Sequence, residues 1–328
     1  MDGEIITALK DIPTTAPPMI EVRGLSKSFK KSLAIDNISF KVQRGEAFGF
    51  IGPNGAGKTT TIRILATLLD PTQGEAFIDG VPVMDDPDTV RRIMGYMPDY
   101  FGIYNGMKLH EYLEFFASAY RKAPSLRKGL VNDVLEITDL GHKRDTLIET
   151  LSKGMRQRLC IAKTLLHDPS VLILDEPASG LDPRARIELK ELLKELNRMG
   201  KTIFISSHIL PELSDICDTI GIIEAGKLLA YGSVENFTED IKAGTLRTLR
   251  IRSLLPVETL AEAVSGREHV LQVEQVRGSL AVQFSGGAPD MARLLEDLVR
   301  EDYKIVEFSE KDTGLEDVFM KITKGVVV

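Results

Sequence analysis

Residues 52–59 read GPNGAGKT, a glycine-rich run that lies between an apolar segment and a helical one. The apolar segment, EAFGFI at 46–51, is typical of a strand buried on both faces of a sheet, and KTTTIRILATLL at 58–69 has helical character. The run matches the pattern G-x-x-x-x-G-K-[ST] in the context that the pattern requires. It therefore favours an α/β fold in which the loop after a buried strand holds phosphate groups.

The residues of this loop have separate tasks. Glycines allow backbone N–H groups to close around phosphate oxygens, and the helix N-terminus adds its positive end. The ammonium group of Lys58 is predicted to reach the β- and γ-phosphates, and the hydroxyl of Thr59 can ligate Mg²⁺. The predicted contacts of the bound nucleotide are Gly52, Pro53, Asn54, Gly55, Ala56, Gly57, Lys58, Thr59 and Thr60.

A second strand pattern, SVLILDEP at 170–177, ends on two carboxylates. Alone, an acidic pair after a strand is most often a solvated turn. Ligands of open α/β folds bind at the carboxyl ends of the strands, however, so the phosphate loop gives the pair a chemical role. We expect Asp175 to hold Mg²⁺ through water and Glu176 to orient or deprotonate the attacking water.

Strand and helix patterns alternate along most of the chain. Strands are expected at 20–25, 37–42, 46–52, 170–177, 201–208 and 218–226, with a helix over 183–200. Two or three amphipathic helices are expected between Tyr96 and Leu151. This predicts an α/β fold: a P-loop NTPase core with a mixed, mostly parallel sheet, an antiparallel β subdomain and a helical insert.

The pattern changes near the two ends of the sequence. Residues 1–18 carry three prolines among small polar residues and predict a flexible tail. The ATPase domain is expected over 19–240, with its helical part at about 100–165. Residues 241–328 predict a small α+β domain to which the sequence assigns no chemistry, with strands at 246–253, 269–278, 279–285 and 303–310 and helices near 256–264, 289–301 and 315–323.

Composition limits the setting in which the chain works. Hydrophobic residues make up 43% and charged residues 27%, with a net charge of -7, so we expect a soluble globular protein and no nucleic-acid partner. No apolar run reaches the roughly 18–20 residues of a membrane span, and the first residues have no signal-peptide pattern. Cys160 and Cys217 lie in apolar helical patterns and are expected to be buried thiols, which fits the cytoplasm.

Further motifs follow in a fixed order and carry a resemblance. They are LSKGMRQRL at 151–159, the segment Ser179 to Asp182, and the triplet Ser206, Ser207 and His208. The first resembles the ABC signature, usually LSGGQ, and the others resemble the D-loop and H-loop of ABC ATPases. Phe29 stands where that family has an aromatic residue that stacks on adenine. The resemblance covers Met19 to about residue 235.

The resemblance implies more than one binding surface. Ser152 and Gly154 would face the γ-phosphate of an ATP bound to a second copy or to a homologous ATPase subunit. Asp182 would belong to the D-loop of the nucleotide site, and His208 would sense the γ-phosphate. Simpler readings stay open: Phe29 as a core residue, Ser152 as a helix N-cap and His208 as a hydrogen-bonding group. Integral membrane permease subunits are the implied partners, which places the chain in the cytoplasm on the inner face of the cell membrane.

The sequence departs from the family at two places. Asp99 follows MGYMP where the family usually has Gln; it can still ligate Mg²⁺ or hold water but adds negative charge near the metal. Lys153 and Met155 replace two residues of LSGGQ, and Lys153 is either an extra cation for phosphate or solvated. With Asp99 in place of Gln, we expect catalysis to survive with altered metal dependence.

Aromatic residues and the C-terminal pattern bear on partners. Tyr100, Phe101 and Tyr104 are expected at the interface with a membrane subunit, and Phe115 and Phe116 in the core of the insert. The closing GLEDVFMKIT resembles an accessory domain of exporter ATPases and favours export. The alternative, a soluble ABC ATPase of the translation or DNA-repair type, is opposed by the single phosphate loop and the lack of a long coiled coil. The sequence does not identify the cargo.

Overall fold

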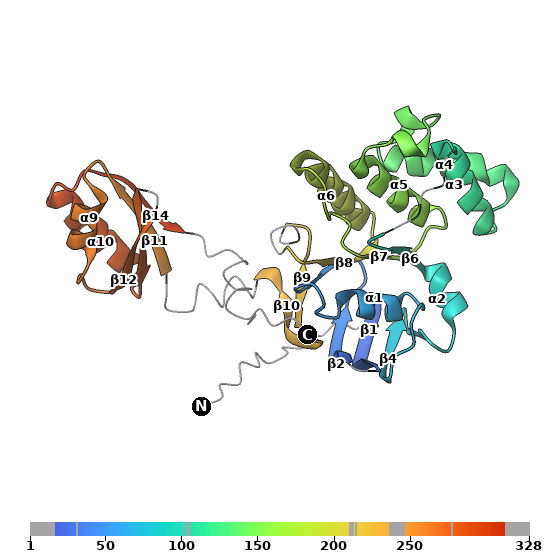
Figure 1. The fold of residues 1–328 in the computed structure, drawn as a ribbon, viewed down its shortest axis with the longest axis horizontal. Coiled ribbons are helices and arrows are strands. Elements are labelled where there is room, and N and C mark those ends of the chain that lie inside the picture. The colour runs from blue at the N-terminus through green and yellow to red at the C-terminus, as the bar shows by residue number, and fades with distance from the viewer. Residues whose placement is uncertain are drawn as a thin grey trace. The chain divides into compact units, whose positions relative to one another are not determined.

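The computed structural model describes residues 17–30, 32–100, 102, 104, 106–209, 213, 215–235, 247–276 and 278–311, with the side chain of Lys311 left aside. Contacts divide the chain between Val234 and Glu235 into two compact units (Figure 1). The predicted limits at 19–240 and 241–328 stay predictions. The predicted tail up to residue 16, the helix at 315–323 and the position of Phe101 lie outside the described residues.

The first unit is built on a six-stranded sheet in the order β10-β9-β3-β8-β7-β6. Five of these strands run parallel, and β10 closes the edge antiparallel to β9. The central strands are apolar runs buried on both faces, as a sheet covered on two sides requires. The strands are β3 (Ala47–Ile51), β6 (Met94–Met97), β7 (Val171–Leu174), β8 (Thr202–Ser207), β9 (Thr219–Glu224) and β10 (Lys227–Ser233).

A four-stranded antiparallel sheet, β2-β1-β4-β5, packs against this sheet through a shared core. Its strands are β1 (Ile20–Phe29), β2 (Ser32–Val42), β4 (Gln73–Ile78) and β5 (Val81–Pro82). Phe40 of β2 meets Phe48, Phe50 and Phe204 of the central sheet with ring centroids 5.4–6.1 Å apart. These contacts hold β3, the strand that leads into the phosphate loop, against the antiparallel sheet.

Helices enclose the sheet and form a separate subdomain within the first unit (Figure 1). Among the described residues, the α-helices with defined bounds are α1 (Lys58–Leu65), α2 (Pro87–Ile93), α3 (Leu109–Ala119), α4 (Pro124–Ile137), α5 (Lys153–Leu165) and α6 (Pro183–Arg198), with 3₁₀ turns η1 (Gly141–Lys143) and η2 (Ile148–Thr150). The expected amphipathic helices of the insert are α3 and α4, which pack together and against α5.

The aromatic residues of the insert only partly follow the prediction. Tyr112 is buried and Phe116 half-buried, but Phe115 is 51% exposed, so its expected place in the core was wrong. Phe115 follows Glu114 on the solvent side of α3, and its ring meets Tyr104, which is equally exposed. Helical periodicity leaves Phe115 one position outside the buried stripe of Leu109, Tyr112, Leu113 and Ala117.

The second unit has the element order β11-α9-β12-β13-α10-β14 and the sheet order β12-β13-β11-β14, all antiparallel. This βαββαβ arrangement is ferredoxin-like. A core of its own joins the sheet to both helices. The elements are β11 (Arg247–Ser253), α9 (Val257–Val264), β12 (Val270–Val276), β13 (Ser279–Phe284), α10 (Ala288–Arg300) and β14 (Ile305–Lys311).

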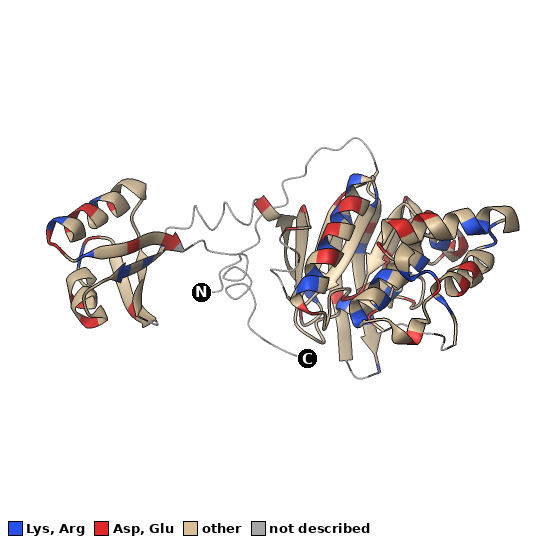
Figure 2. Cartoon of the chain, turned by 90° about the horizontal axis from the view of Figure 1, so that it is seen from above, with Lys and Arg blue, Asp and Glu red and all other residues tan. Residues whose placement is uncertain are grey.

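The described helices carry charges of both signs (Figure 2), and both cysteines lie in the interior. Basic and acidic residues are interspersed along the described helices rather than gathered on one face (Figure 2). Cys160 and Cys217 are buried free thiols, as expected, and burial raises the pKa of Cys160 to about 11. Within the described ranges, no helix is long and apolar enough to cross a bilayer.

Candidate functional site

The phosphate loop leaves β3 at Ile51 and enters α1 at Lys58. A Cβ atom at Gly52 would stand 2.1 Å from the carbonyl oxygen of Ile223, and one at Gly57 would stand 2.6 Å from that of Ala34. Gly57 also has a φ of 108°, a conformation that favours glycine. The two glycines therefore let the loop lie against β9 and β2. The first turn of α1 carries no acidic residue and no side-chain cap, which leaves its N–H groups for an anion.

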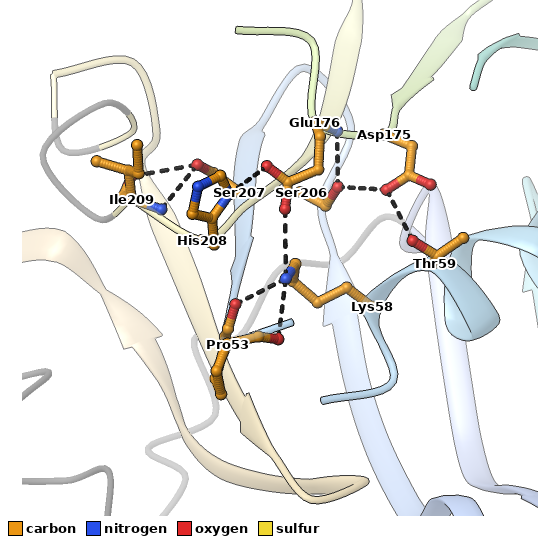
Figure 3. A network of polar contacts seen from close by, with 10 residues as sticks. Pro53, Lys58, Thr59, Asp175, Glu176, Ser206, Ser207, His208 and Ile209 are labelled. Carbon is orange, nitrogen blue, oxygen red and sulfur yellow. Dashed lines mark hydrogen bonds and ion pairs between the residues drawn. The ribbon is translucent and has the colours of Figure 1, made fainter. Parts of the chain in front are cut away.

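Lys58 turns back over this loop and is only 5% exposed. Its ammonium group donates to the carbonyl oxygens of Gly52 at 2.7 Å and Pro53 at 3.2 Å (Figure 3). It also lies 3.3 Å from a carboxylate oxygen of Glu176. The lysine thus carries its charge at the mouth of the loop, between backbone oxygens and the second residue of the acidic pair.

Asp175 directly follows β7 and is 1% exposed. Its Oδ1 accepts a hydrogen bond of 2.7 Å from the hydroxyl of Ser206, and the hydroxyl of Thr59 lies 3.4 Å away (Figure 3). Burial raises the pKa of Asp175, although these two hydrogen bonds act in the opposite direction. An acidic group and a hydroxyl from distant parts of the sequence therefore meet beside the phosphate loop.

Glu176 projects toward Lys58 and His208. Nδ1 of His208 lies 2.7 Å from one carboxylate oxygen, and Lys58 lies near the other. The Glu176 side chain is 13% exposed, so most of its surface is covered by the protein. The geometry brings Lys58, Thr59, Asp175, Glu176 and His208 together at one edge of the sheet.

Asp99 lies just beyond the end of β6, on the strand next to β7, and is exposed. Its negative charge adds to the upward shift of the Asp175 pKa. Tyr96 on β6 is affected as well: burial, followed by the charge of Asp175 and a smaller effect of Asp99, raises its pKa to about 12. A third carboxylate is thus close enough to act electrostatically on the predicted metal ligand.

The oxygen ligands suit Mg²⁺. Thr59 and Asp175 supply hard oxygen donors 3.4 Å apart, and Mg²⁺ is usually held by one or two protein ligands together with phosphate oxygens and water. Within the described ranges no group of three His, Cys, Asp or Glu side chains forms a closed metal cage. The two donors therefore fit a nucleotide-associated ion rather than a self-sufficient structural metal site.

The remaining predicted residues lie apart from this group. Ser152 caps α5 by accepting a hydrogen bond from the N–H of Met155 at 3.2 Å, and Asp182 caps α6 through the N–H of Ala185 at 2.9 Å. These capping bonds are the simpler alternatives for both residues. In the part of the chain that the structure describes, no hydrogen bond or ion pair joins Ser152 or Asp182 to the phosphate loop.

The predicted signature and D-loop segments touch each other. A Cβ atom on Gly154 would stand 2.9 Å from Cβ of Ala185, and one on Gly180 would stand 2.3 Å from Nζ of Lys153. Lys153 therefore lies over the D-loop of its own chain. Phe29 ends β1 and is 45% exposed, which excludes its alternative role as a core residue; its ring lies 5.3 Å from the ammonium group of Lys27.

Comparison with known proteins agrees with this geometry. The sequence matches the ABC transporter family over residues 35–179. The daunorubicin/doxorubicin resistance ATP-binding protein of Streptomyces peucetius is 33% identical over 314 residues, covering 95% of this chain and 93% of that protein. The chain belongs to the ATP-binding proteins of ABC transporters. The predicted family is confirmed, and membership of this ATPase family implies ATP binding and hydrolysis.

Other ABC proteins are similar to nearly the whole chain or to about two thirds of it. The Nod factor export ATP-binding protein I of Rhizobium meliloti is 33% identical over 95% of this chain and 90% of that protein. A solved ATP-binding subunit of an ABC transporter superposes with a TM-score of 0.61 at 32% identity, covering 68% of this chain and 93% of that one. A dimeric post-hydrolysis ABC cassette bound to ADP and Pi has a TM-score of 0.60 at 26% identity, covering 66% and 99%. The predicted fold class is confirmed.

One residue of the candidate site had no role assigned to it by the sequence analysis. Ser206 was grouped with the H-loop triplet, yet its hydroxyl contacts both members of the acidic pair, by accepting from the N–H of Glu176 and donating to Asp175. The usable signal was a hydroxyl at the end of a buried strand that could pair with the SVLILDEP strand. Strand order, which the sequence does not specify, was needed to place it.

We expect Asp99→Gln to raise the Mg²⁺ concentration that half-saturates ATPase activity by about 3- to 10-fold, the effect of one screened charge near the metal. Turnover at saturating Mg²⁺ should change little. Titration of the purified parent and variant with Mg²⁺ at fixed ATP measures this, and Asp99→Glu, which keeps the charge, serves as control. Identical titrations of parent and Asp99→Gln would dismiss the metal effect.

Asp175→Asn should raise the melting temperature of the nucleotide-free protein at neutral pH, because the buried carboxylate has a raised pKa and its ionisation disfavours the folded state. This destabilisation is fully present at pH values above the raised pKa, and it disappears as the pH falls through that pKa toward the ordinary value of 3.8. The difference in melting temperature between variant and parent should therefore shrink on acidification. Calorimetry from neutral to acidic pH checks this, with the exposed Asp85→Asn as control. A difference that grows as the pH falls would contradict the argument.

Proposed function

We propose that this chain is the ATP-hydrolysing subunit of an ABC exporter, that it uses Mg²⁺, and that it works as an ATP-bridged pair bound to membrane subunits at the cytoplasmic face of the cell membrane. The observation that supports the proposal most strongly is the meeting of the phosphate loop with Asp175, Glu176 and His208 at one sheet edge (Figure 3). Each of these groups has a task in phosphoryl transfer to water.

Within one protomer, the loop N–H groups and the start of α1 bind the phosphates of ATP. Lys58 exchanges part of its present contacts, with Gly52, Pro53 and Glu176, for the β- and γ-phosphate oxygens. A bound Mg²⁺, held by Thr59 and Asp175, would neutralise charge that develops on the transferred phosphate. Glu176 accepts the proton of the attacking water, and His208 fixes the Glu176 carboxylate in place.

A second protomer completes the site in this proposal. The N-terminus of α5 has no acidic residue in its first turn, and it carries Lys153, whose ammonium group lies close to Gly180. A helix start of this kind attracts anions, so Ser152, Gly154 and Lys153 are suited to a γ-phosphate held by the other copy. A related ABC cassette forms a dimer, which supports a dimer for this chain.

The helical subdomain provides the surface that we propose for the membrane subunit. Tyr100 is 87% exposed, and Tyr104 and Phe115 are half exposed, with the last two in ring contact. Exposed aromatic residues are enriched at protein interfaces. Phe115 therefore joins the predicted Tyr100 and Tyr104, and this surface replaces its predicted role in the core.

Export is supported by the relatives rather than by the site. One is named for resistance to daunorubicin and doxorubicin, one for resistance to linearmycin and one for Nod factor export, and all align with more than nine-tenths of this chain. These names favour transport over the translation or DNA-repair alternative. The cargo of this chain would be identified by purifying it with its membrane subunits and measuring which compounds stimulate ATP hydrolysis.

Glu176→Gln should lower ATP turnover by about two to four orders of magnitude, because glutamine cannot accept the proton of the attacking water. ATP binding should be retained, since Lys58 and the loop are unchanged. Phosphate release and equilibrium ATP binding of the purified variant separate the two effects. Glu75→Gln, on the exposed face of β4, is the control and should hydrolyse ATP at the parental rate. Near-normal hydrolysis by Glu176→Gln would refute the role of Glu176.

Ser152→Arg should abolish the ATP-dependent dimer, because a large side chain at the start of α5 blocks the approach of another copy's nucleotide. The change is best made in a Glu176→Gln background, where ATP persists, and the dimer measured by analytical ultracentrifugation with and without ATP. Ser125→Arg, at an exposed position in the first turn of α4, is the matched control and should still dimerise. A Ser152→Arg protein that dimerises with ATP like the control would count against the shared site.

A further inference from the structure

Ser206 occupies the strand between the two halves of the ATP site. Strand β8 lies between β3, which leads into the phosphate loop, and β7, which leads into Asp175. Ser206 pairs in register with Phe50 on β3. Ile205, the residue before Ser206, pairs with Leu174, the residue before Asp175, so Ser206 and Asp175 follow a paired position on neighbouring strands. Ser206 has no exposed surface. Its side chain is therefore held between the strands rather than in solvent.

The hydroxyl of Ser206 makes one bond to each member of the acidic pair (Figure 3). It donates to Oδ1 of Asp175 at 2.7 Å and accepts from the backbone N–H of Glu176 at 2.9 Å. A hydroxyl can do both at once, since it has one donor and two acceptor positions. The same oxygen thus fixes the side chain of the first residue and the backbone of the second.

The backbone of Glu176 requires such support. Its φ is 50°, a left-handed backbone conformation that residues other than glycine, asparagine and aspartate rarely adopt. Such a conformation persists where surrounding contacts hold it. Here the N–H bond to Ser206 holds the backbone, and this conformation directs the carboxylate toward Lys58 and His208.

We propose that Ser206 is a positioning residue for ATP hydrolysis, whose hydroxyl locks the Asp175 carboxylate and the Glu176 backbone into one catalytic arrangement. The inference rests on the proposed function, because it assumes that Glu176 acts on the attacking water. Ser206 touches neither the phosphate loop nor Lys58 by any hydrogen bond within the described residues, so ATP affinity should not depend on it. Loss of the Ser206 hydroxyl should therefore lower kcat and leave the Kd for ATP unchanged.

The test compares the full-length parent with Ser206→Ala, which removes both bonds, and Ser206→Cys, which keeps a weak donor and acceptor of similar size. The matched control is Thr202→Val at the other end of β8. Thr202 is also fully buried, and its hydroxyl accepts a hydrogen bond from the N–H of Gly45, far from the acidic pair in the strand register. The kcat and KM for ATP, the equilibrium Kd for ATP and the melting temperature are measured for each.

We expect Ser206→Ala to lower kcat by about 10- to 100-fold, the usual effect of a small misplacement of catalytic groups, with Kd for ATP within about twofold of the parent. Ser206→Cys should fall between Ala and the parent. Thr202→Val should lose stability but keep the parental kcat. If Ser206→Ala does not fold, Ser206→Cys decides: reduced kcat at unchanged Kd supports the proposal.

Three results would overturn the inference. The first is a parental kcat in Ser206→Ala or, if that variant does not fold, in Ser206→Cys. The second is a loss of kcat in Thr202→Val equal to that in Ser206→Ala. The third is a loss of activity that comes from a weaker Kd for ATP while kcat stays parental. Failure of the proposed function is a separate observation, because in that case the parent itself would not hydrolyse ATP.

Discussion

The parallel pairing of β3, β8 and β7 is the interaction on which the proposed ATP site depends. Because these neighbouring strands run in the same direction, their carboxyl ends open on one edge of the sheet. The phosphate loop, the His208 end of β8 and the acidic pair then lie side by side although they come from positions 52, 208 and 175 of the chain. A different strand order would leave the same motifs apart.

Burial at this edge disfavours the charge of Asp175, and paired groups offset this. Asp175 has almost no exposed surface, and the hydroxyl groups of Thr59 and Ser206 solvate it in place of water. Lys58 lies among backbone oxygens and Glu176, which together balance its charge. The charged groups of the site therefore hold one another in fixed orientations.

The described protomer contains one face of the proposed shared site. Ser152 and Asp182 start the neighbouring helices α5 and α6, and the close approach of Gly154 to Ala185 joins these helix starts into one surface. Both side chains cap their own helices, a role that leaves the remaining helix N–H groups available for an anion. Capping and the proposed phosphate contact are therefore compatible, because a cap orients the helix start.

The sequence alone determined the phosphate loop, the acidic pair and most secondary-structure elements. Those signals are local: apolar runs predict β3 and β7, and helical periodicity predicts α3 and α4. The prediction that Phe115 is buried was wrong, because a residue one position outside a buried stripe has nearly the same local sequence pattern as a residue inside it.

Only the tertiary structure decided which residues the acidic pair contacts. Ser206, His208 and Lys58 come from separate segments, and no local pattern states that β8 lies between β3 and β7. Glycine spacing shows that a loop can hold phosphate, whereas the need for glycine at 52 and 57 comes from the carbonyl groups of Ile223 and Ala34. Hydrogen bonds between strands set these neighbours, and they form only when distant parts of the chain pack together.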